Sequence, residues 1–172
     1  MSMKHLLIII CLFSFHQGFS QESCSLKKRE LKVANRLFDS DIETEVINIS
    51  ENLASSLENY NDGDCIYIIK REALPLAYLL STKAKGRFDY FDYIVIYSAD
   101  LTVEGISVIV YRSTNGMGIC QKKWLSQFEG YNGGALELGP DIDAVSGGTI
   151  SATSIVKDIQ RCHLLLSSIE AE

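Results

Sequence analysis

The chain has 172 residues, a length that suits one domain of ordinary size. Its hydrophobic content of 47% and charged content of 22%, with only two prolines, exclude an intrinsically disordered protein. The net charge of −6 argues against a nucleic-acid partner, because phosphate contacts need clustered Lys and Arg side chains.

The first 20 residues have the pattern of a secretory signal peptide. Lys4 supplies a positive start, residues 6–15 form an apolar run, and small polar residues precede a cleavage position after Ser20. The apolar run is too short to cross a bilayer core of about 30 Å. We therefore expect an exported chain with a single domain over residues 21–172, soluble in the periplasm or cell envelope after cleavage. A retained N-terminal anchor is the alternative.

Four cysteines remain in the chain that cleavage would leave. They are Cys24, Cys65, Cys120 and Cys162. An even number in an oxidising compartment permits two disulfides, with three alternative pairings. Buried free thiols are an equally good interpretation, and the sequence does not decide between them.

The first half of the chain alternates between predicted helices and strands. Apolar residues at helical spacing and β-rich runs separated by a polar turn carry this prediction. The predicted elements are helix 25–38 with a solvated basic face, strand 44–49, helix 50–60 with Ser50 as its N-cap, a turn at 61–64, and strands 65–71 and 76–84.

The second half predicts a hairpin and a C-terminal helix. Runs 93–98 and 106–112 flank a polar turn, as in a β-hairpin. Residues 120–128 place apolar side chains on one helical face. Apolar residues then recur at helical intervals over 151–168, with Ser151 placed as the N-cap. The sequence thus predicts an α+β domain with a mainly antiparallel sheet and flanking helices.

Most catalytic and metal motifs are absent from the sequence. His163 is the one histidine after residue 20, and no G-x-S-x-G elbow accompanies it, so a Ser-His-Asp hydrolase is not supported. The S-x-x-K match at 154–157 lacks its companion motifs. Asp141 and Asp143 are candidates for lining a site or for solvating a loop. Neither a Walker A sequence nor a G-x-G-x-x-G fingerprint is present.

The stretch DAVSGGTIS, residues 143–151, joins a glycine loop to the start of the last helix. Free N–H groups at a helix start favour an anion, and Gly147 and Gly148 would let a phosphate approach the backbone. Ser146, Thr149 and Ser151 add hydroxyl groups. A phosphate-bearing ligand fits this pattern. The alternative is that these residues only end a loop and cap a helix.

The same stretch resembles the D-x-x-[ST]-G-A-[TS] signature of the FMN-binding domain family. That family includes the C subunit of the sodium-translocating NADH:quinone reductase and the G subunit of the Rnf complex. The resemblance implies that a flavin transferase joins the FMN phosphate to Thr149 as a phosphoester. The other matched or adjoining positions are Asp143, Ser146, Gly147, Ile150 and Ser151, with Gly148 in place of the usual alanine.

A second segment, STNGMG at 113–118, resembles the family's E-T-P-G-L-G segment, which helps to frame the flavin. Thr114, Gly116 and Gly118 agree with it, whereas Met117 replaces the leucine. Ser113 and Asn115 replace the acid and the proline. The resemblance covers about residues 88–166 of the chain.

The resemblance implies an extracytoplasmic electron-transfer flavoprotein with covalent FMN on Thr149. Its partners would be the transferase and membrane or periplasmic redox proteins, and an electron carrier is favoured over a stand-alone enzyme. The alternatives are a flavin-dependent reductase of a small acceptor and a binding or structural module that is not flavinylated. Tyr93, Tyr97 and Tyr111 are interpreted as core residues, with packing near the flavin ring as the alternative.

Overall fold

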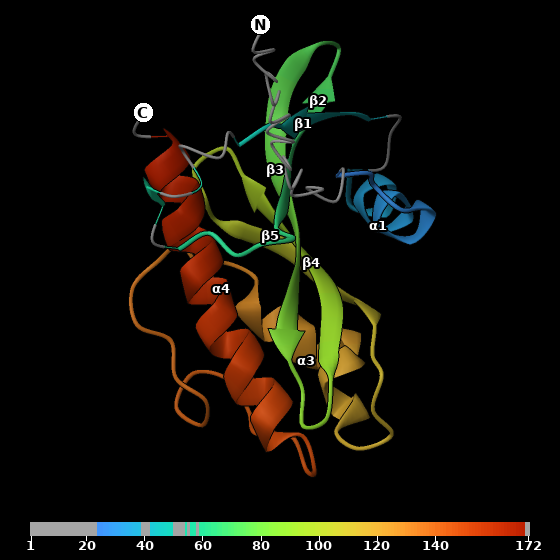
Figure 1. Cartoon of the computed structure of the whole chain (residues 1–172), viewed down its shortest axis with the longest axis vertical. Helices are drawn as coiled ribbons and strands as arrows, with labels where there is room; N and C mark the ends of the chain where they lie inside the picture. The colour runs from blue at the N-terminus through green and yellow to red at the C-terminus, as the bar shows by residue number, and fades with distance from the viewer. Residues whose placement is uncertain (1–23, 39–41, 50–53, 55, 58, 171–172) are drawn as a thin grey trace, which may run out of the picture.

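The computed structural model describes residues 24–38, 42–49, 54, 56–57 and 59–170. Figure 1 shows an antiparallel sheet whose strands follow one another in chain order, with a long C-terminal helix against it. The elements are α1 (Lys28–Phe38), β1 (Glu43–Ile47), β2 (Cys65–Arg71), β3 (Leu74–Lys85), β4 (Tyr90–Ser98), β5 (Val103–Val110), η1 (Met117–Cys120), α3 (Lys122–Leu125), η2 (Ser126–Phe128) and α4 (Thr149–Glu170). The predicted α+β class is confirmed.

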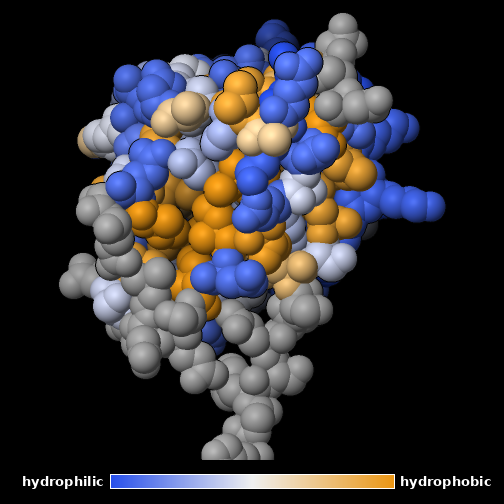
Figure 2. All heavy atoms as spheres, turned by 90° about the horizontal axis from the view of Figure 1, so that it is seen from above, coloured by the Kyte–Doolittle hydropathy of each residue, from blue (hydrophilic) through white to orange (hydrophobic). Residues whose placement is uncertain are grey.

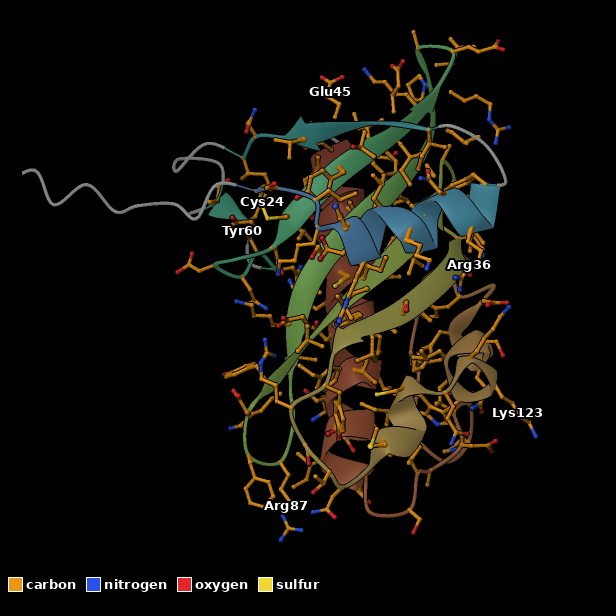
Figure 3. All side chains as sticks on the ribbon, turned by 90° about the vertical axis from the view of Figure 1, so that its right-hand side faces the viewer. Cys24, Arg36, Glu45, Tyr60, Arg87 and Lys123 are labelled. Atoms are coloured by element: carbon orange, nitrogen blue, oxygen red, sulfur yellow. A yellow bond between two sulfur atoms is a disulfide. The ribbon has the colours of Figure 1, made fainter. Side chains whose placement is uncertain are left out.

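Strand β4 lies at the centre of the core because both of its faces are buried. Val95 and Tyr97 pack in the cluster that α4 completes, whereas Ile94 and Ile96 pack with Ala34 of α1. Successive strand residues point to opposite faces, so a continuously apolar strand needs a cover on each side. Helices α1 and α4 therefore lie on opposite faces of the sheet (Figure 3).

The predicted strands are confirmed, with small shifts at their ends. Strands β4 and β5 each begin three residues earlier than predicted, and β3 begins two residues earlier, at Leu74. Glu72 and Ala73 both have positive φ angles, of 50° and 64°. A two-residue hairpin turn of this kind usually carries Gly or Asn. Neither residue is present here, so a turn as tight as this could not be predicted from residue type.

The predicted helix at 25–38 is confirmed as α1, but the single helix expected over 120–128 is wrong. That segment is divided among η1, α3 and η2. Its predicted apolar face is nevertheless buried at Trp124, Leu125 and Phe128. The predicted helix 50–60 falls largely outside the described residues, and its predicted cap Ser50 lies outside them.

The start of the last helix differs from the prediction. Helix α4 begins at Thr149, and the N–H of Ala152 donates to the carbonyl oxygen of Gly148 at 2.8 Å. Gly148 therefore occupies the cap position that was assigned to Ser151. Ser151 lies within the first turn and is 3% exposed, because its hydroxyl meets Tyr111 instead of capping the helix. Glycine is an accepted cap residue, which explains how the helix starts earlier.

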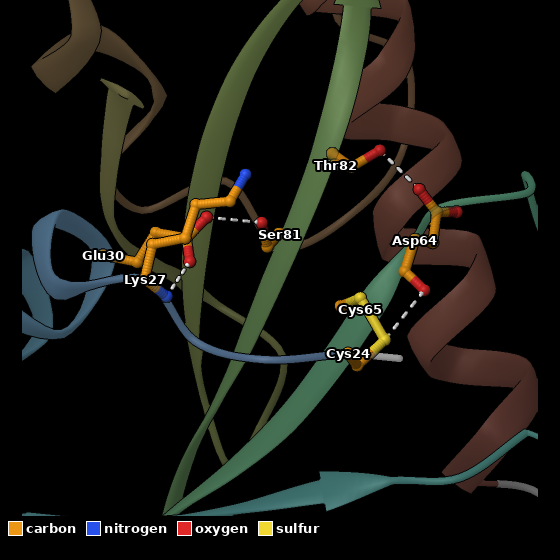
Figure 4. Close-up of a disulfide and its surroundings, with 7 residues drawn as sticks. All are labelled: Cys24, Lys27, Glu30, Asp64, Cys65, Ser81 and Thr82. Atoms are coloured by element: carbon orange, nitrogen blue, oxygen red, sulfur yellow. Dashed lines mark hydrogen bonds between the residues drawn. A yellow bond between two sulfur atoms is a disulfide. The ribbon is translucent and has the colours of Figure 1, made fainter. Parts of the chain in front are cut away.

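A disulfide between Cys24 and Cys65 joins the segment before α1 to the start of β2 (Figure 4). Cys120 and Cys162 are free thiols. The structure thus contains one bridge and two thiols, a combination of the two interpretations that the sequence left open. The bridge closes a separation of 41 residues. Such a link stabilises a small domain by about 2–5 kcal/mol, mainly by restricting the unfolded chain.

We expect the chain from residue 21 to expose two thiols when it is unfolded without a reductant, and four after reduction. In the folded protein Cys162 should not react, because burial raises the pKa of its thiol and little thiolate forms at neutral pH. Counting thiols with a chromogenic disulfide reagent tests this pattern. Four thiols in the unreduced, unfolded chain would contradict the Cys24–Cys65 bridge.

The two ends of the molecule carry different elements. Figure 2 views the end at the top of Figure 1 and shows apolar side chains gathered among polar ones. The first turn of α4 and the β3–β4 turn lie at the opposite end (Figure 1).

Within the described residues, no helix combines the length and apolarity that a bilayer crossing requires. The predicted signal peptide, residues 1–20, lies outside those residues.

Candidate functional site

Thr149 is the first residue of α4, and its side chain is exposed. The preceding turn is closed by the N–H of Gly148, which donates to the carbonyl oxygen of Val145 at 2.9 Å. Gly147 has a φ of +68°, a conformation that L side chains rarely adopt. The N–H groups of the first helical turn have no intrahelical acceptor. The local fold therefore presents the Thr149 hydroxyl beside free backbone donors.

The two segments singled out in the sequence lie against each other. Gly116 has a φ of +74°, and a Cβ added to it would lie 2.5 Å from the Cα of Gly148. A Cβ on Gly118 would lie 2.6 Å from Cγ1 of Val145. These distances are too short for any side chain without movement of the backbone or of Val145. Glycine at 116 and 118 is thus what allows the two loops to touch.

Tyr111 connects the loop at 113–118 to α4. Its hydroxyl donates to the carbonyl oxygen of Asn115 at 2.8 Å and lies 3.1 Å from Oγ of Ser151. The ring packs edge-on against Phe91 at a centroid distance of 5.6 Å. Of the three strand tyrosines, Tyr93 and Tyr97 are fully buried, as the core interpretation expects. Tyr111 instead reaches the candidate site.

A cavity of ≈190 Å³ lies beside Thr149. Its lining residues are Arg87, Tyr111, Asn115, Gly147, Gly148, Thr149, Ile150 and Ser151. Arg87 supplies the one charged side chain in this lining and comes from the turn between β3 and β4. Figure 3 shows Arg87 at the end of the molecule where α4 begins. The cavity thus combines a hydroxyl, helix-start donors and a cation, which suits a phosphate ester.

The first half of the signature stretch faces a different cavity, of ≈480 Å³. This cavity is lined by Gly118, Gln121, Lys123, Trp124, Gln127, Asp143, Ala144, Val145 and Ser146. Trp124 donates from Nε1 to the carbonyl oxygen of Asp143 at 2.7 Å, and Gln127 Oε1 accepts from the N–H of Asp143 at 2.9 Å. These bonds hold the backbone of the acidic residue. The carboxylate itself does not line the cavity beside Thr149.

The structure therefore divides the predicted site residues into groups. Gly147, Gly148, Thr149, Ile150 and Ser151 line the smaller cavity, whereas Asp143, Ser146 and Gly118 line the larger one. Gly116 lines neither cavity, and its lack of a side chain lets the two loops approach each other. Thr114 and Met117 are exposed and line neither cavity.

Sequence reasoning missed Arg87 and assigned no site role to Asn115. Both line the cavity beside Thr149. Arg87 lies far from the signature stretch in the chain, in the short segment GRFD between two strands. Nothing in that segment resembles a binding motif. Only the antiparallel pairing of β3 with β4 and the packing of α4 bring it to the site.

Comparisons with known proteins agree with the geometry. Residues 91–163 match the model of the family described as FMN-binding domain. The fold is similar to that in the crystal structure of NqrC from Shewanella oneidensis, with a TM-score of 0.51, 13% sequence identity, and coverage of 86% of this chain and 91% of that chain. No curated protein matches this chain by sequence.

The residues present fit the group that this family binds. FMN carries a phosphate, and the smaller cavity offers Arg87, an exposed hydroxyl and free N–H groups to such an anion. The family match spans both glycine loops and the first turns of α4. Residues 91–163 of this chain are therefore similar to the FMN-binding domain family in both sequence pattern and site geometry.

Proposed function

We propose that this protein is an electron-transfer flavoprotein that carries FMN as a phosphoester on Oγ of Thr149. The observation that supports the proposal most directly is the place of Thr149. Its side chain is exposed to a modifying enzyme, and it lines a cavity with Arg87 and the first turn of α4. Bound FMN would supply the reversible uptake of electrons, whereas the protein supplies attachment and position.

The chain's own residues would hold the phosphoester and its surroundings. Helix-start N–H groups would donate to the phosphate oxygens, where the helix dipole favours negative charge. Tyr111 keeps Asn115 and Ser151 in fixed relation across the cavity. Thr149 has no adjacent histidine base among the cavity's lining residues. A threonine hydroxyl is a weak nucleophile without such a base, so attachment requires a flavin transferase.

We further propose that the protein works outside the cytoplasm. The signal-like residues 1–20 support export. The Cys24–Cys65 bridge also supports it, because structural disulfides persist in oxidising compartments. Covalent attachment suits that location, since a dissociable flavin would be lost there. The electron-exchanging partners would be membrane or periplasmic redox proteins.

The first test is flavinylation of the exported protein. We expect co-expression with a flavin transferase to add one FMN less one water to the intact mass. Thr149→Ala should abolish the gain, because it removes the only atom proposed to bond to phosphorus. Intact-mass spectrometry with peptide mapping measures both results.

Two controls make the flavinylation result specific. Thr149→Ser keeps a hydroxyl and should retain attachment. Thr114→Ala removes an exposed hydroxyl that lines neither cavity and should also retain it. An unchanged mass for the wild-type protein, under conditions that modify another member of the family, would contradict the covalent proposal. The stretch would then act as a helix cap in a module without covalent flavin.

A further inference from the structure

The turn between β3 and β4 is held against the first turns of α4. The N–H of Lys85 donates to Oγ of Ser154 at 2.9 Å. A Cβ added to Gly86 would lie 3.5 Å from Oγ of Ser151 and 2.6 Å from the carbonyl oxygen of Asp89. Glycine at 86 therefore permits both the tight turn and its approach to the helix. This contact fixes the backbone from which Arg87 projects.

Arg87 differs from Arg112 and Arg161 in having no acidic partner among the described residues. Arg112 is paired with Asp92, and Arg161 is paired with Asp64 and Asp158. Within the described part of the chain, Arg87 makes no ion pair. Its guanidinium lies 5.2 Å from the centre of the Phe88 ring, and its side chain lines the cavity beside Thr149. No carboxylate among the described residues is paired with Arg87, so its positive charge is available to an anionic ligand.

The size of the cavity limits what it can enclose. A volume of ≈190 Å³ is below the roughly 300–1,000 Å³ of pockets that enclose drug-sized ligands. It suits the phosphate end of FMN, with the ring lying outside. Phe88 is 75% exposed and Ile150 is 51% exposed, so apolar surface is present beside the phosphate end.

We propose that Arg87 is a cofactor-positioning residue, whose guanidinium pairs with the phosphoester on Thr149 while its plane is supported by Phe88. This inference rests on the proposed function. A guanidinium presents paired donors that match two phosphate oxygens, which a lysine ammonium does not reproduce. The pair would link the β3–β4 turn to α4 through the cofactor. Flavin attachment should therefore stabilise the folded protein.

The test compares the wild-type protein with Arg87→Met, which keeps the length of the side chain and removes its charge. We expect flavinylation by a limiting amount of transferase to slow roughly three- to tenfold, the range for a partly exposed charged hydrogen bond. Attachment should also raise the unfolding temperature of the wild-type protein more than that of the variant. High salt should reduce this difference, because it screens an exposed pair.

Two further variants complete the test. Arg87→Lys should recover only part of both effects. Lys157→Met removes an exposed cation of α4 that lines neither cavity, and it should behave as the wild-type protein does. If Arg87→Met slows attachment but leaves the stabilisation unchanged, Arg87 acts in contact with the transferase and the inference is overturned. Equal rates and equal stabilisation would also overturn it, while a mass gain on Thr149 would leave the proposed function standing.

Discussion

Replacing Gly116 by alanine is expected to separate the two glycine loops and to slow flavin attachment at Thr149 by more than about tenfold. The new Cβ would lie 2.5 Å from the Cα of Gly148 and 3.0 Å from the carbonyl oxygen of Gly147. Both neighbours are backbone atoms, so a change of rotamer cannot relieve the overlap. The loop before Thr149 must move, and a displacement of about 1 Å at a reacting group can cost about a hundredfold in rate.

The same substitution should lower stability for two separable reasons. Alanine at a φ of +74° costs about 1–2 kcal/mol, and the overlap adds about 1–3 kcal/mol. Gly130→Ala is the matched control, because Gly130 has a φ of +88° with nothing within 4 Å of its added Cβ. Chemical denaturation should show the larger loss for Gly116→Ala, and only that variant should slow attachment. Equal losses and normal attachment in both variants would mean that the loops can separate without affecting the site.

Residue patterns were sufficient to predict the sheet and the glycine loop before α4. Strand β4 is recognisable because its apolar run is continuous, and α4 because its apolar residues recur at helical spacing. The two glycine segments were singled out by their resemblance to family motifs, whereas the contact of Gly116 with Gly148 is visible only in the structure. The strand, the helix and each glycine segment consist of contiguous residues, so their patterns can be recognised in the sequence.

Features that depend on distant residues were not predictable in this way. Arg87 reaches the cavity only because the β3–β4 turn contacts α4. The choice of Cys24 and Cys65 as disulfide partners depends on how β2 lies beside the N-terminal segment. Ser151 was predicted to be the N-cap because the sequence does not reveal that its hydroxyl lies within hydrogen-bond distance of the Tyr111 hydroxyl. In each case a tertiary contact decided between local alternatives.

The structure also gives a physical reason for the departure of Gly148 from the signature. A Cβ at this position would lie 3.0 Å from Cγ1 of Val145 and 3.1 Å from the Cα of Gly116. An alanine would therefore need Val145 and the second loop to give way by a few tenths of an ångström. Glycine here matches the close approach of the loops in this chain. The departure therefore does not by itself indicate a decayed site.

Replacing Arg161 by methionine is expected to cost about 3–5 kcal/mol, because it leaves a buried carboxylate without its partner. Arg161 donates from Nη1 to Oδ2 of Asp64 at 2.6 Å and from Nε to Oδ1 of Asp158 at 2.5 Å. The side chain of Asp64 is 1% exposed and that of Arg161 is 15% exposed. Water therefore cannot solvate the Asp64 charge once the guanidinium is removed. Chemical denaturation measures the loss.

Arg112→Met is the control for the effect of burial, because it also removes an arginine that is paired with a carboxylate but is more exposed. Arg112 also makes two bonds to one carboxylate, that of Asp92, but its side chain is 39% exposed. The side chain of Asp92 is 9% exposed, against 1% for Asp64, so solvent reaches part of that carboxylate and we expect a smaller loss of about 1–2 kcal/mol. Equal losses for the two arginine variants would mean that the Arg161 cluster is solvated in solution. The double variant Asp64→Asn with Arg161→Met should recover part of the stability, because it removes the unpaired charge.

The Arg161 variant also separates the stability of the fold from the chemistry of the site. Arg161 and Thr149 lie on the same helix, but the Asp64–Arg161 pair lies away from the cavity lining. Below its unfolding temperature, the Arg161→Met protein should therefore accept flavin at the wild-type rate. A variant that is less stable yet normally flavinylated would show that α4 has two independent roles. A slowed rate in the fully folded variant would instead show that the buried pair positions the first turn of α4.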